Sequence, residues 1–211
     1  TRTSSHIVKN FCMRNDLQPD HLTVKLQGSA GQSLGAFAAP GLKLEVSGDA
    51  NDYVGKGLSG GTIVVRPPMA SPLRACKNTI IGNTVLYGAT DGFLFAAGRA
   101  GERFAVRNSG ASVVIEGCGS NGCEYMTGGV AVILGTIGAN FGAGMTGGMA
   151  YLYDPDGAAE KLMNHETLVT CPVTQAHWER QLKMLVERHL AETGSVRAEQ
   201  ILQHWDFRGK R

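Results

Sequence analysis

Two glycine-rich stretches have the G-x-G-x-x-G spacing of a dinucleotide-binding loop, at residues 117–122 and 142–147. Such a loop holds a pyrophosphate only when a helix begins directly after it, because the helix N-terminus supplies the N–H groups and a favourable dipole. Here the residues that follow, CEYM and GMAYLY, have the character of short strands. A third stretch, 51–56, partly matches a phosphate-binding loop but lacks the hydroxyl residue after Lys56. The sequence therefore predicts no nucleotide site.

The cysteines could bind a metal or form disulfides, but their spacing favours neither. Cys118 and Cys123 have four residues between them, and no second pair or histidine lies near them in the sequence. The count is odd and no C-x-x-C pair occurs, which indicates buried thiols in a reducing compartment and hence the cytoplasm. The five positions are 12, 76, 118, 123 and 171.

Histidines and acids are also placed unfavourably for catalysis. The six histidines, at 6, 21, 165, 177, 189 and 204, all lie outside the glycine-rich region 28–157. Hexapeptide-repeat acyltransferases need a histidine base on a coil, and carbohydrate-cleaving β-helices need clustered carboxylates. Between residues 108 and 153 the acids are Glu116 and Glu124 alone. We therefore predict no catalytic, cofactor-binding or metal-binding residue in this chain.

The glycines instead mark a repeat of about 19 residues. The phrase MTGGVA at 126–131 returns as MTGGMA at 145–150. Glycine opens a short β-type run at 41, 61, 92, 110, 129 and 148. A fixed period of this length indicates a solenoid, in which each repeat is one coil stacked on its neighbours. The single long interval, from 61 to 92, contains the proline-rich segment 67–72 and predicts an inserted loop.

The composition changes after the glycine ladder. Of 29 glycines, 27 lie between Gly28 and Gly157, whereas both tryptophans lie in the segment from 160 onward. There, helical spacing predicts a hairpin of two helices that packs on a flank or end of the solenoid. We expect Thr174 to cap the first helix, Gly194 to end it and Ser195 to cap the second. The expected apolar faces are Trp178, Leu182, Leu185, Val186 and Leu190, and then Val196, Ile201, Leu202 and Trp205.

Charge is balanced overall but sparse in the ladder. Twenty basic and eighteen acidic residues leave a net charge of +2, which excludes a strongly basic nucleic-acid surface. Residues 108–153 contain no lysine or arginine, so we expect other protein to cover much of this surface. The uncharged stretch 125–153 is long enough to cross a membrane, but one membrane helix has no reason to repeat every 19 residues.

Several long motifs resemble the C-terminal glycine-repeat (GXGXG) domain of the glutamate synthase large (alpha) subunit. The spacing G-x-x-G-x-x-x-G occurs at 28/31/35 and at 135/138/142, and the tail 178–205 is similar to the closing helices of that family. The other matching segments are GDANDYVGKGLSGG at 48–61, GCEYMTGG at 122–129 and GANFGAGMTGG at 138–148.

This resemblance implies an all-β solenoid, a right-handed parallel β-helix of about seven coils with a C-terminal α-helical hairpin. Residues 1–159 would form the lead-in and β-helix, and residues 160–211 the helical extension of the same structural domain. In this family an amidotransferase domain releases ammonia from glutamine, and a synthase domain with FMN and a 3Fe–4S cluster joins it to 2-oxoglutarate. The glycine-repeat domain braces both and carries no cofactor.

The implied partners are therefore those two domains of the same parent chain, with further subunits possible and no nucleic acid or membrane. The implied location is the cytoplasm, or the plastid in a plant. Two alternatives stay open at this point. The chain could be a β-helical subunit of a related oxidoreductase, similar to formylmethanofuran dehydrogenase or to stand-alone glutamate-synthase-like complexes. It could also be an independent β-helix acyltransferase or carbohydrate-active enzyme, although the required residues are missing.

Overall fold

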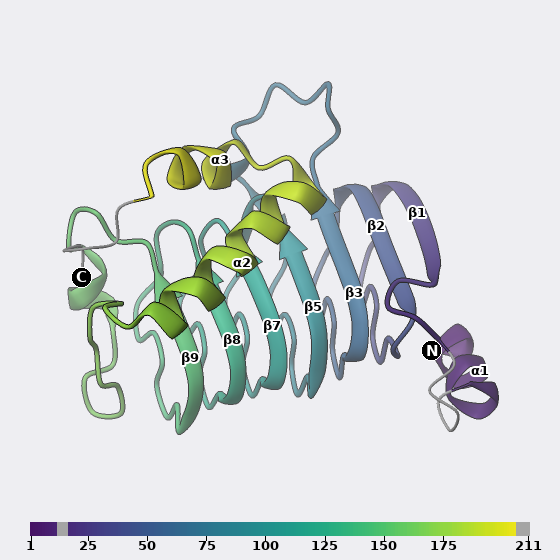
Figure 1. Cartoon of the computed structure of the whole chain (residues 1–211), viewed down its shortest axis with the longest axis horizontal. Coiled ribbons are helices and arrows are strands. Elements are labelled where there is room, and N and C mark those ends of the chain that lie inside the picture. Colours follow the sequence, from purple (N-terminus) through teal and green to yellow (C-terminus); the bar gives the residue numbers. More distant parts are fainter. Residues whose placement is uncertain (12–16, 206–211) are drawn as a thin grey trace.

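The computed structural model describes residues 1–11 and 17–205 of the chain, and Figure 1 shows a row of parallel strands crossed by one long helix. The elements are α1 (Arg2–Asn10), β1 (Leu22–Ser29), β2 (Leu42–Asp49), β3 (Ser59–Arg66), η2 (Ala75–Lys77), β4 (Thr79–Ile81), β5 (Asp91–Ala96), β6 (Arg99–Ala100), β7 (Ser109–Ile115), β8 (Thr127–Ile133), β9 (Gly147–Leu152), η3 (Ala159–Leu162), α2 (Ala176–Thr193) and α3 (Val196–Gln203).

The predicted solenoid is confirmed. Within the described ranges, seven strands form a parallel sheet in the order β1-β2-β3-β5-β7-β8-β9. Leu22 pairs with Leu42 and Lys43 with Thr62, so successive coils are 20 and 19 residues apart. Thr62 then pairs directly with Phe93, which confirms that the long interval is an insertion. The short strands β4 and β6 pair in a second small sheet on another side of the coil.

The central strands β3, β5 and β7 are buried on both faces, which explains their nearly continuous apolar runs, whereas β1 at the open end is exposed along most of its length. Side chains alternate along each strand. In β7, Val113 and Ile115 point into the solenoid and join its interior core, whereas Val114 points outward. The outward set, including Val64, Phe95 and Val132, packs against α2 and α3. Two hydrophobic cores therefore share one sheet, one inside the coil and one beneath the helices.

The turns between strands form a second ladder with an unusual backbone. In each turn, three residues two positions apart have positive φ, at 33/35/37, 53/55/57, 84/86/88, 103/105/107, 121/123/125 and 140/142/144. This alternation points successive N–H groups in opposite directions. Tyr53 and Gly57 donate to carbonyls of the following coil, and Gly55 donates to the preceding one. Many of these positions are not glycine, and each costs about 1–2 kcal/mol of strain that the ladder must offset.

The C-terminal helices largely follow the prediction. Gly194 ends α2 in the left-handed conformation, with φ +67°, and the Ser195 hydroxyl accepts a hydrogen bond from the Ala198 N–H as the cap of α3. Two details were wrong. The N-cap position of α2 is Gln175, one residue after the expected Thr174, and its side chain makes no capping hydrogen bond. Val196 was placed on the apolar face of α3, but its side chain is 65% exposed because the helix turns Ala198 and Ile201 toward the sheet instead.

Helix α2 lies diagonally across the face of the sheet and contacts β3, β5, β7 and β8 (Figure 1). The outer face of the charge-poor strands is thus covered by the chain's own helices. The expected cover of other charge-poor surface by another protein stays a prediction. The end of the solenoid is closed by a different segment. Phe141 exchanges backbone hydrogen bonds with Leu162 and Asn164, so the region around η3 stacks on the last turn. The hairpin therefore covers a flank, and η3 covers the end.

The insertion after β3 leaves the solenoid as a projecting arm, seen above the strands in Figure 1. We define the arm as residues 67–78. In the part of the chain that the structure describes, no helix is both long enough and apolar enough to cross a membrane. The uncharged stretch 125–153 instead forms β8, a turn and β9.

Candidate functional site

The glycine motifs lie in turns of the solenoid. Residues 117–122 lead into the turn before β8, and residues 142–147 lead into β9. A strand follows in both cases, so the helix N-terminus that a dinucleotide site requires is missing at each. The segment 51–56 lies in the turn between β2 and β3, where Gly55 supplies one of the positive-φ positions. These glycines serve close coil stacking.

The thiol pair lies in the interior core. Cys118 and Cys123 are fully buried, and desolvation raises the pKa of Cys118 to about 12 and that of Cys123 well above its ordinary value. Neutral thiols are poor metal ligands and poor nucleophiles. Across residues 1–11 and 17–205, no group of three or more His, Cys, Asp or Glu could hold a metal ion. Cys76 is half-buried and Cys171 exposed, whereas Cys12 lies outside the described residues.

One buried polar cluster joins the sheet to the helices. Glu116 follows β7 and is 1% exposed, and His189 in α2 is 0% exposed. The Ser195 hydroxyl donates to Glu116 Oε1, and His189 Nε2 lies 3.8 Å from the same oxygen. The same Ser195 oxygen caps α3 through the Ala198 N–H at 3.0 Å. We call Glu116, His189 and Ser195 the Glu116 cluster.

The Glu116 cluster contains the residue types of a hydrolase triad in a different arrangement. Ser195 bonds to the carboxyl group, whereas a triad serine must bond to the histidine that takes its proton. All three side chains are also sealed beneath α2, so a substrate cannot reach them. Neither ring nitrogen of His189 nor Glu116 Oε2 has a hydrogen-bond partner among the described residues. The cluster fixes the position of the two helices on the sheet.

The prediction from sequence missed this cluster because its members lie far apart in the chain. Glu116 was noted only as a rare acid, and the histidines only as absent from the ladder. A signal was available in hindsight. His189 falls three and four residues after Val186 and Leu185, on the apolar face of α2, where a polar residue needs a buried partner. Glu116 directly follows the apolar run at the end of β7.

A second polar contact fixes the C-terminal end of α2. Lys43 Nζ on β2 lies 2.6 Å from Glu192 and 3.2 Å from Glu45. Burial by itself lowers the pKa of Lys43, but the hydrogen bonds and attraction of Glu192 and Glu45 outweigh it and raise the pKa above its ordinary value. Arg188 completes the contact, because its guanidinium lies 4.0 Å from the centre of the Phe93 ring.

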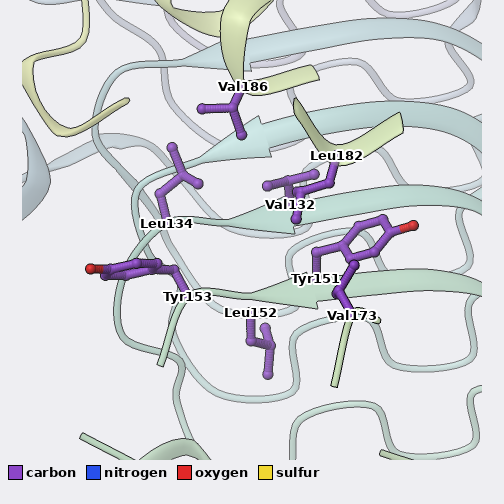
Figure 2. A pocket seen from close by; sticks show the side chains of 8 residues that line it. All are labelled: Val132, Leu134, Tyr151, Leu152, Tyr153, Val173, Leu182 and Val186. Carbon is purple, nitrogen blue, oxygen red and sulfur yellow. The ribbon is translucent and has the colours of Figure 1, made fainter. Parts of the chain in front are cut away.

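Two hollows complete the candidate surfaces. Figure 2 shows Val132, Tyr151 and Leu182 meeting between the sheet and α2, around an apolar cavity of about 30 Å³ that has no room for a cofactor. A shallow hollow of about 330 Å³, lined by both polar and apolar residues, lies at the base of the arm. It is lined by Ser29, Gly31, Asp49, Ala50, Asn51, Thr79, Ile80, Ile81 and Gly82.

These features define a class of protein, the glycine-rich parallel solenoid with helices packed over one flank. The profile of the GXGXG motif family matches residues 1–211, and the chain belongs to that family.

Its relatives are glutamate synthases. The chain is 66% identical over 205 residues to the glutamate synthase [NADPH] large chain of Azospirillum brasilense, covering 97% of this chain and 14% of that protein. It is 52% identical to the ferredoxin-dependent glutamate synthase of Pyropia yezoensis, covering 98% of this chain and 13% of the relative. It is 50% identical to ferredoxin-dependent glutamate synthase 2 of Synechocystis, covering 100% and 13%. The chain thus corresponds in sequence to one domain of a much larger chain.

Proposed function

We propose that this chain is the structural domain of a glutamate synthase, which converts glutamine and 2-oxoglutarate to two glutamates. In this proposal the solenoid braces the amidotransferase domain against the synthase domain with FMN and a 3Fe–4S cluster. The domain itself supplies no catalytic or cofactor-binding residue, and it acts in the cytoplasm, or in the plastid of a plant. The observation that carries the proposal is the match of the whole solenoid to one segment of far longer glutamate synthase chains.

Rigidity supports this role. Strand pairing runs through the full sheet, and the positive-φ turns add a second set of hydrogen bonds between coils. The helices cross several coils and are fixed by the Glu116 cluster at one point and by Lys43 at another. Transfer of ammonia between two sites needs those sites in constant register, since an intermediate that escapes is lost to solvent. A brace that bends would defeat that transfer.

A glycine substitution in the full-length chain tests the proposal. Gly148 has φ +84°, and an added Cβ would lie 2.8 Å from Met126 Cε and 2.9 Å from the Gly128 carbonyl carbon. Gly88 has a similar φ of +63° but open space around the same position, which makes it the matched control. We expect Gly148→Val to reduce glutamine-dependent glutamate formation well below that of Gly88→Val.

The partial reactions separate bracing from chemistry. Glutaminase activity and ammonia-dependent glutamate formation should persist in Gly148→Val, because the reacting groups lie in other domains. Loss of both partial reactions together would contradict a bracing role, as would unchanged coupling in a variant with a lowered melting temperature. The alternatives of a separate oxidoreductase subunit or an independent β-helix enzyme gain no support from the relatives named above.

A further inference from the structure

The arm is not needed to build the solenoid. Thr62 pairs directly with Phe93 across the insertion, and the ladder continues on both sides of it. The arm nevertheless presents two apolar side chains at its surface, Met69 at 96% and Leu73 at 60% exposure. Other large apolar side chains are exposed as well, such as Val169, Met184 and Val196, but Met69 and Leu73 are an exposed pair on one inserted loop. An exposed apolar pair on an extra loop needs another explanation, and a contact surface supplies one.

The arm is also held in a defined shape. It contains Pro67, Pro68 and Pro72, which restrict the backbone. The Ser71 N–H bonds to the Pro68 carbonyl at 2.9 Å, and the Leu73 N–H bonds to the Ser71 hydroxyl at 3.3 Å. The helical turn η2 follows directly. A loop that is rigid before binding loses less entropy on binding than a flexible loop does.

The charge of the arm indicates the chemistry of its partner. The segment from Arg66 to Asn78 carries Arg66, Arg74 and Lys77 and contains no acidic residue. None of these three cations forms an ion pair with another residue in the ranges 1–11 and 17–205. Unpaired cations beside exposed apolar groups complement an apolar hollow that is bordered by carboxylates.

We propose that the arm docks into a neighbouring domain of the parent chain, at an apolar hollow edged by Asp and Glu side chains. This docking proposal rests on the proposed function, and it identifies the arm as a surface through which the domain contacts its neighbour. The matched segment is only 14% of the Azospirillum relative, so most of such a chain lies outside this structure. A protein partner fits better than a lipid surface, because two apolar side chains bury too little area for stable insertion.

The test compares two double variants. Met69→Asp/Leu73→Asp changes the arm, and Met184→Asp/Val196→Asp changes two residues of α2 and α3 that are each 65% exposed. Each is expressed as the separate chain, and its affinity for the large chain lacking this segment is measured by calorimetry. We expect the arm variant to bind at least 10-fold more weakly than wild type, and the control within 2-fold. Equal binding of both would overturn the role of the arm but not the proposed function.

A second measurement decides the case in which the wild-type chain does not rebind. Amide hydrogen exchange of residues 67–78 is then compared between the separate chain and the full-length chain. Slower exchange in the full-length chain supports docking, and identical exchange refutes it. In a third measurement, the wild-type chain is mixed with anionic phospholipid vesicles and tested for flotation with them. Flotation that is lost in Met69→Asp/Leu73→Asp would assign the arm to a membrane and overturn the proposal.

Discussion

Replacing His189 by leucine should be among the most damaging single changes to the helical part of this protein. The imidazole lies 3.8 Å from Glu116 Oε1, and both side chains are almost completely buried. Breaking a buried pair by removing one partner typically costs about 3–5 kcal/mol, because the other polar group stays buried without compensation.

The double variant should recover part of that loss. Glu116→Leu alone leaves a buried imidazole and costs about 1–3 kcal/mol. With Glu116→Leu and His189→Leu together, the two leucines extend the core beneath α2, and we expect a remaining loss of about 1–3 kcal/mol, because the buried Ser195 hydroxyl loses its acceptor. The coupling energy between the two sites is then about 3 kcal/mol or more. The exposed pair Lys183 and Glu187, whose side chains are 48% and 54% exposed, serves as control, with an expected coupling below about 1 kcal/mol.

Urea unfolding measures these values with two probes. Trp178 and Trp205 both pack in the core beneath the helices, so their fluorescence reports helix docking, whereas circular dichroism reports the sheet. His189→Leu should lower the melting temperature by roughly 6–20 °C for a chain of this size. Additive effects of the two leucine substitutions, with a coupling below about 0.5 kcal/mol, would refute the argument that Glu116 and His189 hold the helices as a pair.

Three further outcomes are expected. In Gly110→Ala the added methyl group would overlap a carbonyl of the preceding coil, so urea unfolding should show a loss of about 3 kcal/mol in stability. Gly88→Ala adds only φ strain and should lose about 1 kcal/mol. Equal losses would show that the spacing between coils adjusts to the extra methyl group. In thiol labelling at pH 8, exposed Cys171 should react rapidly, while the two buried solenoid thiols react only after denaturation, and rapid labelling of either would contradict their raised pKa. The pKa of Lys43 is raised on folding, so its ion pairs stabilise the protein fully below the ordinary value of 10.5, and that stability is lost as pH rises through the raised pKa. Unfolding curves of Lys43→Met should therefore lack this loss of stability at alkaline pH. An identical loss in both proteins would assign it to other groups.

Local pattern was enough to predict the solenoid. Glycines at a period near 19 predict stacked coils even when the contacts of each coil are unknown, because the period is the number of residues in one coil. The caps of the helices were equally local. As caps, Gly194 and Ser195 bond to atoms within four residues of themselves, so this role follows from residue type and position, whereas the bond from Ser195 to Glu116 does not.

What the helices cover was decided only in three dimensions. The sequence predicted that the amphipathic tail packs on a flank or end of the ladder, but not which of the two it covers or which strands lie beneath it. That placement depends on contacts between residues such as Glu116 and His189, which are far apart in sequence. The period and spacing of residues in the sequence do not predict which distant residues form such a contact. The positive-φ turns were also hidden, because residues such as Tyr53 and Cys123 adopt that conformation only under the hydrogen bonds of neighbouring coils.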